Sequence, residues 1–169
     1  VRKGARAVAS KVVEVRRAIH RHPELGNDLP RTRATVLEAL AGLDLEIHQS
    51  NSTSGIVAVL NSERNDGGHV LLRGDMDALP MPEDTGLPFA SEVPGRMHAC
   101  GHDTHTAMLV GAAHLLCARR DTLPGKVTFM FQPGEEGPGG AQPMLDEGIL
   151  EAGGRPDGAF ALHVHPTAE

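Results

Sequence analysis

Residues 104–131, THTAMLVGAAHLLCARRDTLPGKVTFMF, contain the pattern that decides the fold class. Apolar residues recur at helical spacing from Thr104 to Arg119, which predicts an amphipathic helix. After a short connection, the segment from Lys126 to Phe131 is apolar and brief, as is typical of a buried strand. A helix that leads directly into such a strand is one unit of an α/β domain.

The rest of the chain repeats this alternation. Helical periodicity predicts helices over 2–21 and 30–43 and a helical turn or more over 142–147, and β-rich segments predict strands over 46–49, 55–60, 69–73 and 159–164. A long irregular loop marked by Pro and Gly lies between Pro80 and Gly95. We therefore expect an α/β fold with a mixed, largely parallel sheet flanked by helices.

Composition excludes several classes of function. The 169 residues suffice for one domain, the net charge is −6 with scattered basic residues, and only 2% are aromatic, so we expect no nucleic-acid partner. No apolar run approaches the roughly 18 residues needed to span a membrane, so we expect no membrane partner. The first residues lack the apolar segment of a secretory signal, and two cysteines are too few for a disulfide framework, which favours the cytoplasm. The chain starts at Val1 rather than Met, so the natural N-terminus is expected to lie upstream.

The chain has ten histidines, and several of them lie with acidic residues in four polar clusters. Three of the clusters follow predicted strands, and the fourth directly precedes the helix that begins near Thr104. Because the carboxyl ends of strands form the ligand crevice of open α/β sheets, all four clusters can converge on one site. The clusters are Arg73–Asp77, His98–Asp103, Gly134–Gly137 and His163–Pro166.

Two of these clusters carry donor groups that suit a metal ion. Cys100 and His102 flank Gly101, which lets the backbone bend so that both side chains reach one metal or two adjacent ones. The alternative is a buried cysteine beside a surface histidine. In the adjacent pair Glu135 and Glu136, one carboxylate can bind a metal while the other takes a proton from metal-activated water. The alternative there is an acidic surface turn.

The remaining candidates lie at strand ends. Asp75 and Asp77 share one side of a strand, where they can bind a cation, orient a ligand histidine or remain solvated. His163 and His165 also share a side, and His163 fits a metal ligand or a core histidine. Structural roles are expected for the other histidines considered and for the second cysteine, namely His20, His22, His105, His114 and Cys117.

Five motifs in one order resemble a known family. They are HRHPEL (20–25), RGDMDALP (73–80), HACGHDTH (98–105), FQPGEEG (131–137) and ALHVHP (161–166). Together they resemble the amidohydrolase branch of the dinuclear zinc peptidase superfamily. That branch includes hippurate hydrolases, N-acyl-amino-acid amidohydrolases, N-acetyldiaminopimelate deacetylases and hydrolases of auxin–amino acid conjugates.

The resemblance implies a role for each motif residue. It implies hydrolysis of the amide bond of a small N-acyl-amino acid, with two divalent metal ions, zinc first and manganese, cobalt or nickel as alternatives. Asp75 stands where the peptidase branches carry a histidine, which with Cys100 favours the amidohydrolases. The implied metal ligands are Cys100, His102, Glu136 and His163, the implied general base is Glu135, and Asp77 is implied to orient the metal site.

The resemblance also implies a domain organisation. Residues 1–169 match the first segment of the catalytic domain, whereas family members add a lid domain and a final segment with one more histidine ligand. We therefore expect the isolated chain to be a poor catalyst and to self-associate through uncovered apolar surface. A non-catalytic metal-binding or assembly function is an alternative. A Cys100 nucleophile is disfavoured because it leaves Glu135 and Glu136 without a role.

Overall fold

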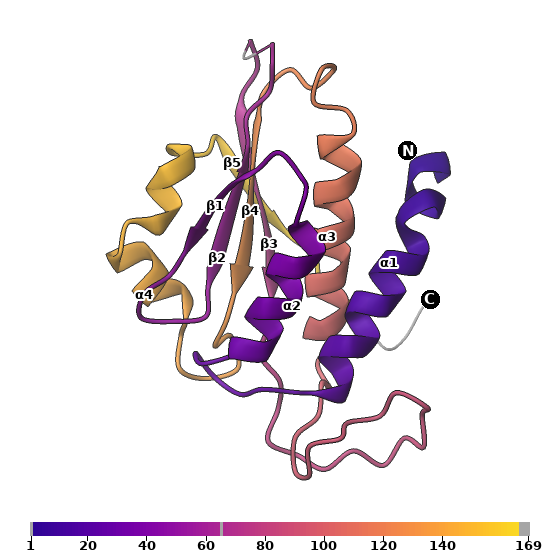
Figure 1. The fold of residues 1–169 in the computed structure, drawn as a ribbon. Coiled ribbons are helices and arrows are strands. Elements are labelled where there is room, and N and C mark those ends of the chain that lie inside the picture. Colours follow the sequence, from indigo (N-terminus) through magenta and orange to yellow (C-terminus); the bar gives the residue numbers. More distant parts are fainter. Residues whose placement is uncertain (1, 65, 166–169) are drawn as a thin grey trace.

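The computed structural model describes residues 2–64 and 66–165, which form one sheet with helices on both faces (Figure 1). The α-helices are α1 (Arg2–Arg21), α2 (Pro30–Leu40), α3 (His102–Cys117) and α4 (Ala141–Asp146), and a 3-10 helix, η1 (Ile149–Gly153), follows α4. The strands are β1 (Glu46–Gln49), β2 (Ile56–Leu60), β3 (His69–Asp75), β4 (Lys126–Gln132) and β5 (Gly158–Ala161). The α/β fold expected from the sequence is confirmed.

The described strands form a mixed sheet in the order β1-β2-β4-β3-β5. β2 is antiparallel to β1 and β4, whereas β3 is parallel to both β4 and β5, so four of the five strands run in one direction. Parallel strands end at the same edge of a sheet, and the long loop over 76–101 lies beyond that edge (Figure 1). This edge is where the polar clusters after β3, β4 and β5 must meet.

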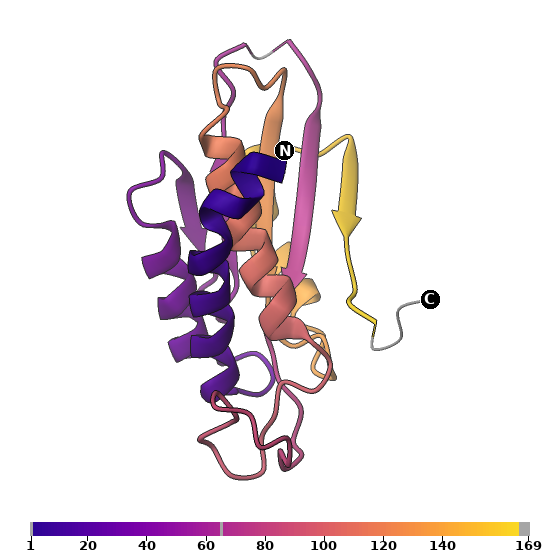
Figure 2. The same cartoon turned by 90° about the vertical axis from the view of Figure 1, so that its right-hand side faces the viewer.

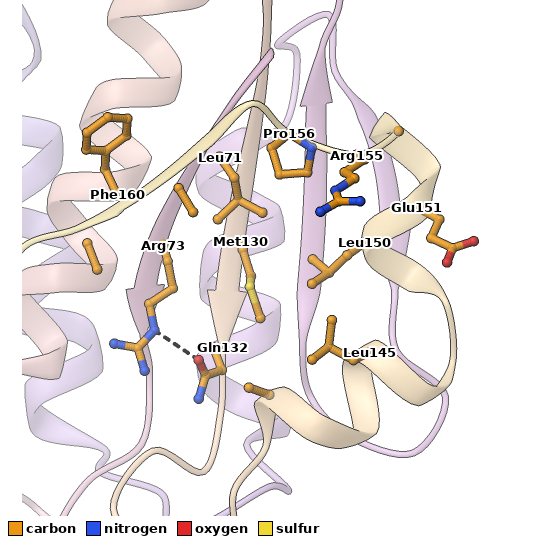
Figure 3. A pocket seen from close by; sticks show the side chains of 14 residues that line it. Leu71, Arg73, Met130, Gln132, Leu145, Leu150, Glu151, Arg155, Pro156 and Phe160 are labelled. Carbon is orange, nitrogen blue, oxygen red and sulfur yellow. Dashed lines mark hydrogen bonds between the residues drawn. The ribbon is translucent and has the colours of Figure 1, made fainter.

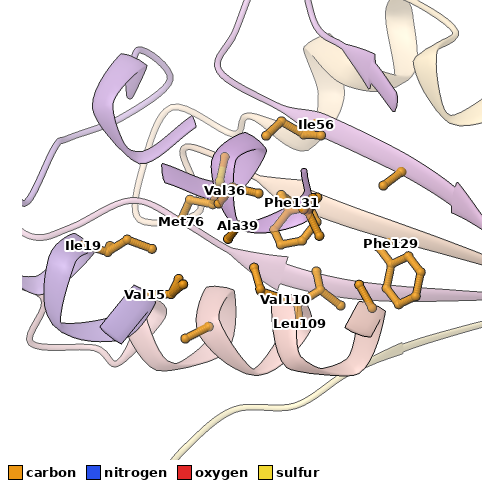
Figure 4. Close-up of a cluster of buried hydrophobic side chains, with 14 of the residues drawn as sticks. Val15, Ile19, Val36, Ala39, Ile56, Met76, Leu109, Val110, Phe129 and Phe131 are labelled. Carbon is orange, nitrogen blue, oxygen red and sulfur yellow. The ribbon is translucent and has the colours of Figure 1, made fainter. Parts of the chain in front are cut away.

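Both faces of the sheet are covered, which explains why β2 is apolar and buried at every position and why β4 has an apolar middle. Side chains alternate along a strand. In β4, Phe129 and Phe131 therefore pack into the core formed with α1, α2 and α3 (Figure 4), while Met130 faces Met144 of α4 and Ile149 of η1. The view along the sheet shows α1, α2 and α3 together on one side (Figure 2). Within the described residues, no helix has the length and apolarity needed to cross a membrane.

Helix and strand ends are fixed by local chemistry. Glu24 accepts hydrogen bonds from the backbone N–H groups of Thr32 (2.8 Å) and Arg31 (3.2 Å), which satisfies free donors at the start of α2. The helix ends at Leu40 rather than at the expected Leu43, and Gly42 follows with a φ of 80°.

β5 is shorter than expected from the sequence, because it ends at Ala161 and not at Val164. The backbone N–H of Val164 donates to Nε2 of His105 at 2.9 Å. This N–H group therefore bonds to a side chain of α3 and not to a neighbouring strand. His163 therefore lies in a short extended segment after the sheet, anchored next to the first turn of α3.

Candidate metal centre

Four segments bring the candidate site residues together at the carboxyl edge of the sheet. β3 leads into Asp77, the turn before α3 carries Cys100, β4 leads into the Glu135–Glu136 turn, and β5 leads to His163. The described residues contain three groups of possible metal-binding atoms. Within each group, the atoms lie within 4.8 Å of one another. The groups are Cys100, His102 and His163; His102, Glu135 and Glu136; and Asp75, His102 and His105.

His102 is common to all three groups and lies at the centre of the site. Its side chain is 1% exposed, and its Nε2 lies 3.7 Å from Glu136 Oε1 and 3.8 Å from Glu135 Oε2. Neither ring nitrogen makes a hydrogen bond, and Nδ1 lies 3.4 Å from Asp77 Oδ1. Burial acts to lower the pKa of His102, but the surrounding carboxylates, Asp77 first, outweigh it and raise that pKa above its ordinary value.

Asp77 fixes the turn that carries the paired glutamates. Its Oδ1 accepts a hydrogen bond from the backbone N–H of Glu135 at 2.9 Å, and its Oδ2 accepts one from that of Glu136 at 3.0 Å. Burial opposes the charge of Asp77, but His102 and the two N–H groups outweigh it and hold the pKa of Asp77 below its ordinary value. One carboxylate thus contacts both the histidine and the glutamate turn, which gives physical support to the orienting role expected for Asp77.

Cys100 and His163 meet at the exposed side of the site. The Sγ of Cys100 lies 3.4 Å from Nε2 of His163, although 63 residues separate them, and His163 is exposed. Burial raises the pKa of the Cys100 thiol to about 11, and the carboxylates of Glu136, Glu135 and Asp75 act in the same direction. Without a cation the thiol is therefore protonated, and a bound cation is what would favour the thiolate.

Gly101 makes the turn between Cys100 and His102 possible. Its φ is 96°, a conformation that favours glycine, and a Cβ there would lie 2.3 Å from a methyl carbon of Val164. The segment that carries His163 therefore packs directly on the turn that carries Cys100. The tight bend expected from the sequence is confirmed.

The polar side-chain atoms of Asp75 and His105 make hydrogen bonds within the protein. Asp75 Oδ1 lies 2.6 Å from Nδ1 of His105, and Asp75 Oδ2 accepts a hydrogen bond from Arg73 at 2.6 Å. The other ring nitrogen of His105 accepts the N–H of Val164. His105 thus holds the segment after β5 in place, which is compatible with the structural role expected for it. Cys117, which packs against the hydrophobic core, and His114, which bonds to the carbonyl of Ala39, also have the expected structural roles.

A second group of buried polar residues was not anticipated. His20 is buried and its Nδ1 lies 2.8 Å from Asp103 Oδ2, while Arg16 Nε donates to the same oxygen at 3.0 Å. His98 is 4% exposed with no hydrogen bond to either ring nitrogen, and burial lowers its pKa to about 4. The sequence placed His20 at a helix end, but no spacing rule joins it to an aspartate 83 residues away.

A cavity of about 880 Å³ lies on the α4 face of the sheet, and none of the candidate ligands lines it (Figure 3). Apolar side chains such as Leu71, Met130 and Leu150 line it, and Arg73 and Gln132 lie at one end, where they share a 2.9 Å hydrogen bond. Arg73 also bonds Asp75, so it is the link between this cavity and the site.

The residues at the site fit a metal centre. Each buried polar group without a partner costs about 1–3 kcal/mol, and His102 presents two ring nitrogens in that state beside several carboxylates. A cation would satisfy the ring and offset the negative charge. A sulfur, imidazole nitrogens and carboxylate oxygens form the donor set that zinc prefers.

Comparison with known proteins agrees with this geometry. The sequence profile of peptidase family M20/M25/M40 matches residues 71–169. This chain belongs to that family. In Bacillus subtilis, a dinuclear metal-binding peptidase of the M20 family has a solved structure with a TM-score of 0.87 and 40% identity, covering 95% of this chain and 44% of that one.

Two curated relatives of this M20/M25/M40 chain are similar over nearly its whole length. Thermostable carboxypeptidase 1 of Saccharolobus solfataricus is 40% identical over 161 residues, which cover 94% of this chain and 40% of the relative. N-acetyl-L-cysteine deacetylase of Bacillus subtilis is 40% identical over 156 residues, which cover 92% and 36%. The chain thus spans about two fifths of the length of these relatives.

Proposed function

We propose that this chain supplies the dinuclear metal centre of an amidohydrolase that cleaves N-acyl-amino acids. The observation that carries the proposal is the buried, unpartnered ring of His102 at the meeting point of a thiol, an imidazole and two glutamates. We assign Cys100, His102, Glu136 and His163 as metal ligands and Glu135 as the general base. Two bound divalent cations would polarise the amide carbonyl and make water more acidic.

Exposure supports different roles for the two glutamates. The side chain of Glu136 is 24% exposed and, after burial, it is the main cause of the raised pKa of the Cys100 thiol, whereas the Glu135 side chain is 42% exposed. The more exposed Glu135 is placed to accept a proton from the attacking water. It then returns this proton to the amine nitrogen as the C–N bond breaks.

The substrate class rests on two relatives that share one chemistry. A deacetylase acting on an N-acetyl-amino acid and a carboxypeptidase both cut an amide bond to the nitrogen of an amino acid with a free carboxylate. We favour N-acyl-amino acids because Asp75 stands in the position where the peptidase branches carry histidine. Zinc is the metal we favour, since Cys100 offers sulfur, with manganese, cobalt or nickel as alternatives.

Two further assignments are proposals of the same kind. Residues 1–169 would form the first segment of the metallopeptidase-like catalytic domain, in keeping with the two fifths of the relatives that they span. Both cysteines are free thiols, and a metal-binding thiol is best kept reduced, so we place the protein in the cytoplasm.

Self-association stays a prediction, supported by the exposed Phe160 and Leu162 beside the sheet edge.

The test compares two single substitutions in the complete gene product. Glu135→Gln should keep the metal content of the wild type and lose about 10²–10⁴-fold in turnover of an N-acetyl-amino acid panel, because an amide cannot take the proton. Glu136→Gln should lose both metal, measured by elemental analysis, and turnover. Glu63→Gln, at an exposed position outside the five motifs, is the matched control.

Each other outcome has a definite meaning. The reverse pattern would show that the base and ligand assignments are exchanged. A wild-type protein that binds two metal equivalents but hydrolyses no member of the panel would favour the metal-binding or assembly function. A wild-type protein that binds no divalent metal would overturn the proposed centre.

A further inference from the structure

The buried group formed by His20, Asp103, Glu83 and His98 surrounds the turn that carries two proposed ligands. Asp103 follows His102 directly, and His98 stands two residues before Cys100. The His20 ring lies between them, with Nδ1 2.8 Å from Asp103 Oδ2 and its centroid 6.2 Å from that of His98. Helix α1 therefore contacts the ligand turn on both of its sides.

Both ring nitrogens of His20 face carboxylates. Nε2 lies 3.3 Å from Glu83 Oε1, and the side chains of His20 and Glu83 are 4% and 3% exposed. Glu83 also accepts the backbone N–H of Ser91 at 2.7 Å, so it is fixed within the long loop. The hydrogen bond with Asp103 is the main cause that raises the pKa of His20 above its ordinary value. A ring with a carboxylate at each nitrogen thus connects α1, the loop and α3.

Asp103 depends on these partners because it is buried. Its residue is 1% exposed, and its second donor, Arg16, has a side chain that is 41% exposed and therefore well hydrated. Truncating one member of a buried charge pair leaves the other charge uncompensated, which is costly. Since Asp103 follows His102 in the first turn of α3, a backbone shift that relieves this cost would also move His102.

We propose that His20 is a positioning residue of the metal centre, which holds the Cys100–His102 turn in binding geometry through its hydrogen bond to Asp103. This inference rests on the proposed function, because it assumes that Cys100 and His102 bind metal. His20 touches neither ligand itself. Its effect passes through Asp103 to the backbone of His102.

The test uses substitutions that separate the two sides of the ring. The amide nitrogen of asparagine reaches roughly the place of Nδ1, so His20→Asn keeps the bond to Asp103, whereas glutamine reaches roughly the place of Nε2, so His20→Gln keeps the bond to Glu83. His20→Leu removes both. His22→Leu is the matched control, because His22 is the neighbouring histidine at the end of α1 and its ring pairs with the exposed Glu92, at 3.8 Å.

The measurements are made on the metal-free complete gene product titrated with Co²⁺. The affinity comes from competition with a chelator, and the thiolate-to-cobalt absorption band reports the Cys100 bond. We expect His20→Leu and His20→Gln to raise the Co²⁺ dissociation constant about 10–100-fold and to weaken the band, with His20→Asn and His22→Leu close to wild type. A purely structural role would lower the melting temperature and leave the band and the affinity of the folded protein unchanged.

The outcomes distinguish this proposal from the one on which it rests. A wild-type protein without a cobalt–thiolate band would overturn the metal centre itself. A normal wild type with unchanged His20→Leu and His20→Gln variants would overturn the positioning role alone, as would a His20→Asn variant as weak as His20→Leu. If His20→Leu does not fold, the asparagine and glutamine variants decide. Failure of both to fold would assign His20 to folding and reject the proposal.

Discussion

The substitution Asp77→Asn tests whether one buried carboxylate organises the proposed metal centre. The Asp77 side chain is fully buried and accepts the backbone N–H groups of Glu135 and Glu136 at 2.9 and 3.0 Å. Asparagine keeps one oxygen acceptor, but its NH₂ group would then face the other N–H. A hydrogen bond to a charged group contributes about 1.5–3 kcal/mol, so we expect a loss of about that size in the unfolding free energy.

This loss has two measurable consequences. For a urea m-value of about 1–3 kcal/mol/M, the unfolding midpoint of the metal-free protein should fall by about 1 M. Metal affinity should fall about 10–100-fold, since Asp77 also lies beside Nδ1 of His102. Asp84→Asn, an exposed aspartate in the adjoining loop, is the control. An Asp77→Asn protein with the wild-type midpoint and the wild-type metal dissociation constant would refute the argument.

Two further predictions concern stability away from the site. Phe129→Ala, at a fully buried position of β4, should lower the unfolding free energy by about 3–5 kcal/mol in urea titrations, whereas Phe160→Ala, at a side chain 61% exposed, should change it little. Hydrogen bonds from Ser52 and Asn51 lower the pKa of Glu147 from 4.5 to about 2, so its contribution is present above about pH 4.5 and is lost as the pH falls toward 2. Glu147→Gln should thus melt at a lower temperature at pH 7, and a constant difference from wild type between pH 7 and pH 2 would contradict this.

The convergence of the site residues could be predicted from the sequence because it follows from topology. Parallel strands end at one edge, so polar residues directly after β3, β4 and β5 had to approach one another. His163, which follows β5, lies at this edge, 3.4 Å from Cys100 in the turn before α3. The same rule placed the Glu135–Glu136 turn near His102, since β4 pairs with β3 in a register that ends at Asp75 and Gln132.

The pairing of buried polar side chains could not be predicted in the same way. Periodicity shows which side of a helix is apolar, but it does not show which carboxylate a histidine will meet. His20 lies at the end of a helix, and only the packing of α1 on the start of α3 brings it to Asp103. The early end of β5 has a similar cause, because the Val164 N–H bonds to the His105 ring, a choice between partners that the sequence of the strand does not reveal.

Carboxylates outnumber arginines at the site, so a bound cation would offset an excess of negative groups. Asp75, Asp77 and the two glutamates surround a histidine and a thiol, and Arg73 contacts this group through Asp75 alone. The same carboxylates that raise the pKa of Cys100 would attract a divalent ion, and the ion would in turn favour the thiolate. The carboxylates that keep the Cys100 thiol protonated in the absence of a metal ion would therefore help a metal ion to bind there. In the proposed centre, the buried Asp77 and His102 would fix the geometry, while the exposed His163 and Glu135 would be accessible to the metal and the substrate.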